Sequence, residues 1–221
     1  MDWIVEPCCG LPLVFGVSNF TKTPTILSSN NTLSNSTIRI IAGISSLAYA
    51  LLGLVQQNPC SGYDLRKIFA STAMKSYSDS PGAIYPALRR LEQQGLIRGR
   101  IEKGSGLRRR QVFRVTAKGT TELKKWITRP LTQDNIAGGM KELMLRFAFS
   151  EKAAGSGASV QLIRALGAQL EQYVPMLRGQ LNAGKAVMPR SGRLALESGI
   201  RGYECLLEWT KYALASYERK E

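Results

Sequence analysis

The stretch that decides the fold covers residues 80–97 and reads SPGAIYPALRRLEQQGLI. It starts like a helix, because Ser80 can cap the first turn and Pro81 suits the first helical position. Apolar side chains then recur at spacings of four and three along one helical face: Ile84, Leu88 and Leu91. Gly95 suits the left-handed turn that ends a helix. The stretch therefore predicts an amphipathic helix that leads directly into a strand.

Upstream of this stretch, the pattern predicts two further helices. Apolar residues recur at helical spacing from Ser46 onward, and the pair Asn58 and Pro59 ends that first helix. The second helix starts at Ser61, and Asp64 three residues later completes the pattern of a capping box. The helix predicted within residues 80–97 is thus the third of three consecutive helices.

Downstream, two short β-like runs at residues 96–101 and 111–115 flank a glycine-rich turn. Three adjacent arginines follow this turn: Arg108, Arg109 and Arg110. Two such runs around a glycine-rich turn predict a hairpin with a basic tip. Thr116 then caps a further helix, which Pro130 closes. Three helices followed by a two-stranded basic wing is the element order of a winged helix-turn-helix.

The net charge of +14 is concentrated in the same region. Residues 46–130 carry 16 basic and 5 acidic side chains, a net charge of +11. A local excess of this kind is typical of a surface that contacts phosphates. The alternative is a generally basic surface that serves solubility.

Several classes of chemistry find little support in the composition. The chain has no histidine, which removes the usual general base and the commonest metal ligand. The four cysteines, Cys8, Cys9, Cys60 and Cys205, form no Cys-x-x-Cys pair. We therefore expect no enzyme, no metal site and no cofactor, and a cytoplasmic protein with reduced thiols.

Residues 1–45 are interpreted as a disordered N-terminal extension. Residues 28–37 read SSNNTLSNST and offer almost no apolar area to offset the entropy of ordering. The apolar run at residues 40–55 is uncharged, but its 16 residues fall short of the roughly 20 that cross a bilayer. A membrane-anchored regulator is the alternative, which we do not favour.

The third helix and the wing supply the candidate DNA contacts. A helix fits the major groove and its first residues meet base edges, while a basic wing neutralises phosphates. The candidate DNA-binding residues are Lys75, Ser78, Ser80, Ala83, Tyr85, Arg89, Arg108, Arg109 and Arg110. Tyr85 has an equally good alternative role in packing within the fold, and Arg89 has one on a solvated face.

Beyond a linker or hinge at residues 129–139, the pattern predicts helices around 143–149, from about 159, and from about 193. The last helix carries a 4-3 apolar stripe with one polar break at Thr210: Leu196, Ile200, Tyr203, Leu207, Leu214 and Tyr217. Residues 140–221 are therefore interpreted as a helical dimerisation domain. The alternative is that the stripe packs two helices against each other within one chain.

Trp126 and Trp209 are candidate walls of an effector site. Both lie near the junction of the two regions in sequence order, and flat ligands favour aromatic walls. Packing within the core is the alternative role for both tryptophans.

Much of the chain resembles the PadR family of bacterial regulators. The resemblance lies in LLGLVQQNPCSGYDLRKIF at 51–69, SPGAIYPALRRLEQQGLI at 80–97 and RRRQVFRVTAKG at 108–119. KELMLRFAFSEKA at 141–153 and LALESGIRGYECLLEWTKYAL at 194–214 resemble the helical dimerisation region of the family's longer subgroup. The Ser-Pro-Gly-x-Ile-Tyr-Pro-Ala-Leu run is the most specific of these motifs.

This resemblance implies a homodimer that binds palindromic operators in double-stranded DNA, usually as a repressor. It also implies release of the DNA by a small aromatic or drug-like effector. The N-terminal extension lies outside the family pattern, and Pro175 falls where an unbroken helix is expected.

We therefore expect a mainly α fold with a small β-hairpin wing. It comprises a winged helix-turn-helix at residues 46–130 and a C-terminal α-helical dimerisation arm. The leading function is a sequence-specific transcriptional regulator. The alternative is an architectural DNA-binding protein with no effector and little sequence specificity.

Overall fold

In the computed structural model of the chain, the described residues are 44–78, 80–103 and 109–219. The N-terminal extension and the tip of the hairpin, with Arg108, lie outside them. The N-terminal half of the described chain has the following elements: α2 (Ser46–Gln57), β1 (Cys60–Ser61), α3 (Gly62–Ser71), η1 (Ala73–Ser76), α4 (Pro81–Gln93), β2 (Ile97–Lys103), β3 (Arg109–Val115) and α5 (Ala117–Ile127). This is the winged helix-turn-helix order that the sequence predicts.

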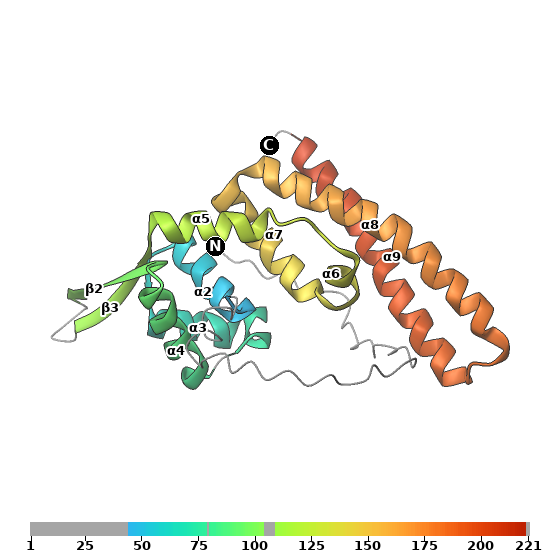
Figure 1. Cartoon of the computed structure of the whole chain (residues 1–221), viewed down its shortest axis with the longest axis horizontal. Coiled ribbons are helices and arrows are strands. Elements are labelled where there is room, and N and C mark those ends of the chain that lie inside the picture. Colours follow the sequence, from blue (N-terminus) through green and yellow to red (C-terminus); the bar gives the residue numbers. More distant parts are fainter. Residues whose placement is uncertain (1–43, 79, 104–108, 220–221) are drawn as a thin grey trace, which may run out of the picture.

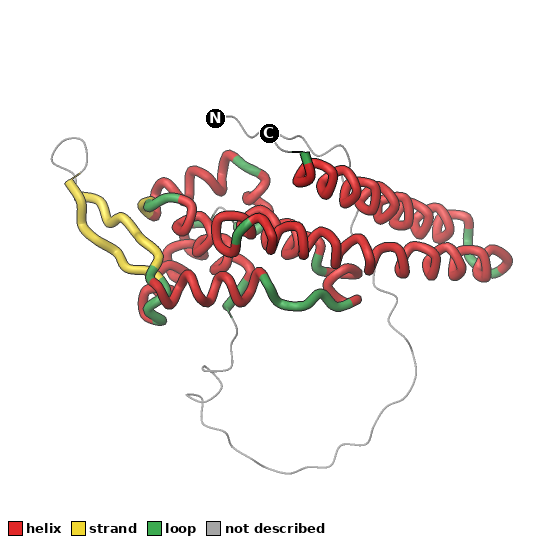
Figure 2. The backbone as a smooth tube through the Cα atoms, turned by 90° about the horizontal axis from the view of Figure 1, so that it is seen from above, coloured by secondary structure: helices red, strands yellow, loops and turns green. Residues whose placement is uncertain are grey.

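The remaining elements are all helical: α6 (Gln133–Gly138), α7 (Met140–Ala154), α8 (Ser156–Ala183), η2 (Gly184–Ala186) and α9 (Arg190–Glu218). Figure 1 shows α8 and α9 side by side as a long hairpin at the opposite end of the molecule from β2 and β3. We call this two-helix hairpin the arm. The view from above in Figure 2 shows the same separation of wing and arm.

The ends of α3 and α4 follow local signals in the sequence. Ser61 and Asp64 form the predicted capping box of α3, with Ser61 Oγ accepting from the Asp64 N–H at 3.2 Å. Gly95 follows α4 with φ +71°, the left-handed conformation that glycine adopts without strain. Ser80 occupies the N-cap of α4 but makes no side-chain capping bond. Instead, the Ser80 N–H donates to Ser78 Oγ at 3.2 Å.

The sheet has three antiparallel strands in the order β1-β3-β2. The strand β1 was not expected, because its two residues carry no pattern of their own and pair with β3 some fifty positions later. Val112 and Phe113 of β3 pair on both sides, and Phe113 lies opposite Cys60 of β1 and Gly99 of β2. The two long strands also extend further toward the tip than the predicted runs did.

One hydrophobic core joins this sheet to the helices of the domain. Among its fully buried side chains are Leu51, Leu65, Ile84, Leu88 and Leu123. The close packing of α5 depends on Gly119, where a Cβ would lie 2.0 Å from the carbonyl oxygen of Leu96. The core therefore fixes α4 and the wing against one scaffold.

The C-terminal half differs from expectation in two places. The predicted linker contains the helix α6, which is anchored by Ile136 at 1% exposure. Pro175 is exposed and lies inside α8, which continues through it as one helix of 28 residues. Among the described residues, no helix is both long enough and apolar enough to cross a membrane.

Candidate nucleic-acid interface

The outward face of α4 carries the residues best placed to meet a groove. Its inner face is buried in the core through Ile84, Ala87, Leu88 and Leu91. At 3.6 residues per turn, the opposite face is one exposed row: Gly82, Pro86, Arg89 and Gln93. Of these, only Arg89 was predicted from the sequence as a DNA contact. The other three share its face because the burial of the apolar residues turns them outward.

The remaining predicted contacts of this region lie around the start of α4. Ser80 is exposed at the N-cap, Lys75 is exposed on η1, and Ser78 and Ala83 are half-buried. Tyr85 is 41% exposed and flanks the outward row. These residues therefore surround the N-terminal turn of α4, the part of a recognition helix that meets base edges.

Tyr85 has the packing role that was the alternative, and part of its side chain is still exposed. A Cβ on Gly62 would lie 2.7 Å from Tyr85 Cε1, so the ring packs closely over the first residue of α3. The rest of the tyrosine remains accessible at the surface. Gly62 thereby lets α3 and α4 approach each other while Tyr85 stays beside the outward row.

The wing contacts both α3 and α4. Glu92 Oε1 of α4 accepts the backbone N–H of Gly99 in β2 at 2.8 Å. Arg110 Nη1 lies 3.8 Å from the Asp64 carboxylate of α3, and Arg114 pairs with Glu102 across the hairpin at 3.3 Å. Exposed pairs of this kind contribute little to stability, so these arginines can exchange partners.

The cap of α3 fixes the protonation state of Asp64. Hydrogen bonds from the backbone N–H and hydroxyl of Ser61 hold the pKa of the Asp64 carboxyl below its usual 3.8, and Arg110 lowers it further. The carboxyl is therefore ionised at neutral pH. Its charge offsets that of Arg110, which lies near the tip of the hairpin.

Arg109 differs from Arg110 and Arg114, the other two arginines of β3. It is exposed at the start of β3, opposite Lys103 of β2. It makes no ion pair with any residue that the structure describes. Arg109 is thus the described charge of β3 best placed to contact an external phosphate. The third member of the triplet, Arg108, lies outside the described residues.

The helix α3 adds exposed groups that sequence reasoning did not select. Tyr63 is 64% exposed, and Arg66 and Lys67 are exposed on the same helix. The guanidinium carbon of Arg66 lies 5.9 Å from the centre of the Tyr63 ring. In helix-turn-helix proteins the helix before the recognition helix crosses the DNA backbone. The sequence signal that could have pointed to these residues of α3 was the excess of positive charge across residues 46–130.

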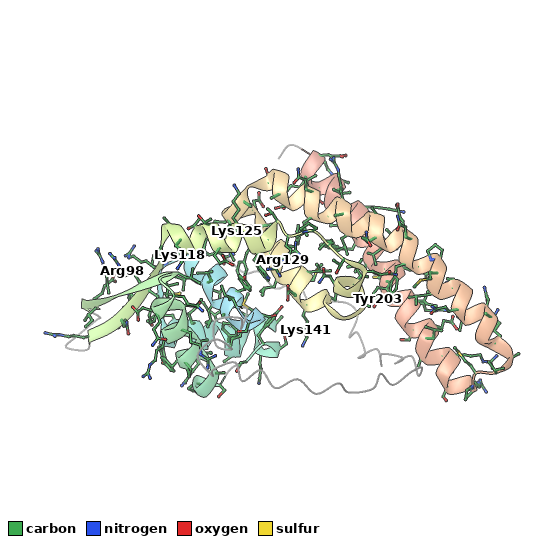
Figure 3. The ribbon with its side chains drawn as sticks, in the orientation of Figure 1. Arg98, Lys118, Lys125, Arg129, Lys141 and Tyr203 are labelled. Atoms are coloured by element: carbon green, nitrogen blue, oxygen red, sulfur yellow. The ribbon has the colours of Figure 1, made fainter. Side chains whose placement is uncertain are left out.

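The positive charges of residues 46–130 do not all lie on one side of the domain. Figure 3 labels Arg98 on β2 and Lys118, Lys125 and Arg129 along α5 and just beyond it. In the view of Figure 1, α5 lies on the upper side of the domain and α4 on the lower side. Arg98, Lys125 and Arg129 therefore lie outside the exposed row of α4, whereas Lys118 Nζ donates to the carbonyl oxygen of Gln94, the C-cap residue of α4, at 2.8 Å. We call these four residues the second basic row.

The predicted dimerisation stripe makes extensive contacts within the chain. Ile200 has 0% exposure and packs against Val174, Leu177 and Leu181 of α8. Leu196 packs against the same cluster. This matches the alternative in which the stripe joins two helices of one chain.

The other members of the stripe make contacts with α6, α7 or α8. Tyr203 meets Tyr173 edge-on with ring centres 5.2 Å apart, and Leu207 packs against a cluster that includes Leu166 and Leu170. Tyr217 donates a hydrogen bond to Glu151 at 3.3 Å, and Leu214 is half-buried. A dimer surface therefore has to draw on other residues of the arm as well.

The two candidate effector tryptophans lie in different environments. Trp126 is 1% exposed and stacks on Tyr49 with ring centres 4.3 Å apart. Burial and the neighbouring Glu122 raise the pKa of Tyr49 to about 12, so this ring stays neutral. Trp209 meets Phe147 edge-on and lines a small apolar hollow. The two tryptophans do not share a site.

The hollow is a candidate ligand space beside Trp209. Its walls come from the segment before α6 and from α7, α8 and α9: Leu131, Leu143, Met144, Phe147, Leu162, Ile163, Leu166 and Trp209. About 210 Å³ of empty space lies within it, part of it open to solvent. The cavity itself amounts to about 10 Å³, far below the roughly 300–1,000 Å³ of typical ligand pockets. No cluster of potential metal ligands occurs among the described residues.

Comparison with known proteins agrees with this geometry. The Bacillus subtilis negative transcriptional regulator PadR is 31% identical over 83 residues, which is 38% of this chain and 46% of that protein. A probable transcriptional regulator of Mycobacterium tuberculosis is 24% identical over 187 residues, 79% of this chain and 99% of that protein. The crystal structure of Bacillus subtilis PadR with operator DNA has a TM-score of 0.39 and 22% identity, covering 79% of this chain and 99% of that one.

The best-matched region is the winged helix. The chain spans less than half of the length of Bacillus subtilis PadR at the level of sequence. Residues 51–125 match the transcriptional regulator PadR-like family, from within α2 to near the end of α5. Through this match, and through the winged-helix elements that these residues form, residues 51–125 are similar to the PadR-like family of transcriptional regulators.

Proposed function

We propose that this protein is a dimeric, sequence-specific transcriptional repressor. In this proposal, α4 contacts the base edges of DNA and the wing contacts its phosphates. The observation that carries the proposal is the exposed row of α4, with Arg89 at its centre and the wing fixed beside it. An arginine on such a face can donate two hydrogen bonds to the major-groove edge of guanine. The exposed Arg109 suits a phosphate.

The assignment as a repressor is supported by the relative in Bacillus subtilis, which is named a negative transcriptional regulator. A protein that occupies promoter DNA needs no further activity to block transcription. Repression therefore requires only the DNA contacts described above.

Dimerisation is supported by the exposed apolar groups of the arm. Met176, Leu194 and Tyr212 are 40%, 57% and 65% exposed on α8 and α9, which form a layer only two helices thick. A second copy of the chain would cover these groups. Twofold symmetry would also place two α4 helices about 34 Å apart, one turn of DNA.

Release by a small aromatic effector is the regulatory part of the proposal. Phe147 and Trp209 provide aromatic walls to the hollow, and the remaining lining is aliphatic or methionine. Because the hollow is smaller than a typical pocket, a ligand would have to displace α7 or Trp209 on entry. Movement of α7 would reach the DNA-binding domain directly.

Selection of bound sequences from random DNA is the test of the proposed function. We expect a palindromic site with two half-sites, and Arg89→Ala should relax the preference at one position in each half-site by about 1–3 kcal/mol. Lys125→Ala, on the side away from α4, serves as the control and should leave the selected site unchanged. Recovery of no common sequence would contradict the proposal.

An architectural DNA-binding protein is the second candidate, and the second basic row favours it. Arg98, Lys125 and Arg129 offer charge outside the exposed row of α4. An architectural protein would use both sides without reading bases. Its affinity would then depend on salt and barely on sequence.

A further inference from the structure

The helix α7 joins the arm to the DNA-binding domain through a buried arginine. Arg146 has only 2% exposure, and its Nε and Nη2 donate to the carbonyl oxygen of Ile127 at 3.1 and 2.7 Å. Nη2 also donates to the carbonyl oxygen of Arg129. Ile127 is the last residue of α5, where helical carbonyls lack partners and attract cations. Arg146 therefore closes the C-terminal end of α5 from another helix.

One turn earlier on α7, Glu142 makes a second polar connection. Its carboxylate accepts the indole N–H of Trp126 at 3.2 Å and the hydroxyl of Ser46 at 3.3 Å. The three residues come from α7, α5 and α2, so one carboxylate connects three helices. Burial lowers the pKa of the Arg146 guanidinium, but arginine remains charged at neutral pH. The joint thus holds one positive and one negative side chain.

Close packing fixes the same joint from a third direction. Phe149 of α7 is 2% exposed and lies against Gly53 of α2. A Cβ on Gly53 would lie 2.3 Å from the Phe149 ring, which is closer than carbon atoms approach. Only a glycine at this position lets α7 sit at its present distance from α2.

We propose that Arg146 and Glu142 are positioning residues that hold the DNA-binding domain at one angle to the arm and so set the half-site spacing. This inference rests on the proposed function, because spacing has meaning only for a dimer on two half-sites. Adding one base pair moves a half-site by about 3.4 Å and rotates it by about 34°. A domain fixed at three points cannot follow such a change without breaking contacts in the joint.

The test uses the full chain and the operator obtained by selection. Duplexes with the two half-sites moved apart or together by one and two base pairs are titrated with the native chain and with Arg146→Met. We expect Arg146→Met to lower the preference for the native spacing about tenfold, within the 5–150-fold range typical of coupled sites. Its affinity for a single half-site should be unchanged, because α4 and the wing remain intact. Arg164→Met, which replaces an exposed arginine of α8, is the control.

A second variant keeps the test decisive if Arg146→Met does not fold. Gly53→Ala forces α7 away from α2 but adds helix propensity to α2 itself. It should broaden the accepted spacing in the same way. Gly157→Ala, a helical glycine with no atom within 4 Å of its would-be Cβ, is its control.

The outcomes are distinguishable. Folded, dimeric Arg146→Met or Gly53→Ala protein that keeps the native spacing preference would overturn the inference. A native chain that binds half-sites equally well at every spacing would overturn it as well. If the native chain selects no operator at all, the proposed function fails first.

Discussion

The wing offers a quantitative prediction, because Arg109 is exposed on β3 and makes no described ion pair. Each phosphate contact contributes about 0.9 to the slope of log affinity against log salt. A dimer carries two copies of Arg109, so Arg109→Ala should flatten the slope by about 1.8. Between 50 and 200 mM salt, the ratio of native to variant affinity should then shrink about twelvefold.

Two matched variants make this number specific. Arg114→Ala removes a charge that Glu102 already pairs at 3.3 Å, so we expect a smaller change in slope. Lys125→Ala removes a charge on the side away from α4 and should leave the slope unchanged. The loss should also be equal for operator and random duplexes, because phosphate contacts carry no sequence information.

The assay is titration of a fluorescent duplex, followed by anisotropy, at four salt concentrations. An unchanged slope for Arg109→Ala would remove the described part of the wing from the DNA interface. A slope that flattens for Lys125→Ala would place the phosphates on the opposite side of the domain. Either result would refute the reasoning from exposure and pairing.

Three further predictions concern stability and assembly. Leu207→Asp places a charge among buried apolar groups and should lower the free energy of unfolding by about 3 kcal/mol. Tyr212 is exposed, so Tyr212→Asp should separate the dimer without lowering the melting temperature. The reverse pattern in calorimetry and sedimentation would place Leu207 at the subunit interface. Gly119→Ala should cost about 2 kcal/mol in denaturant unfolding, because its Cβ meets backbone that cannot swing aside; an unaffected midpoint would contradict this. The folded-state pKa of Asp64 is lowered, so its contribution is complete above pH 3.8 and is lost as the pH falls through that lowered value. Native protein should therefore lose more stability than Asp64→Asn on acidification below about pH 4, and parallel curves would count against the capping role.

Local signals account for the parts of the fold that the sequence predicted. The capping box of Ser61 and Asp64 lies within one turn, and the left-handed Gly95 ends α4 by its own conformational freedom. Such features depend on neighbours in the chain, so they can be recognised without a structure. The order of three helices and a basic hairpin followed from them.

Contacts between distant segments were not predictable in the same way. Arg146 and Glu142 belong to a stretch with charges of both signs, and sequence patterns alone place such charges on a solvent-exposed face. Their burial depends on the carbonyl groups at the end of α5 and on Trp126, which only the folded chain brings near. The stripe on α9 illustrates the same limit, because periodicity gives a face but not the partner of that face. Ile200 turned out to meet α8 of its own chain.

The measurement that tests the central claim most directly is the ratio of two affinities at one stated salt concentration. The full chain is titrated with its selected operator and with a scrambled duplex of equal length and composition. A sequence-specific regulator predicts a ratio of about 1,000 or more, and Arg89→Ala should reduce that ratio without changing the affinity for the scrambled duplex. A ratio close to one for the native chain would contradict the account, because it would show binding through charge alone.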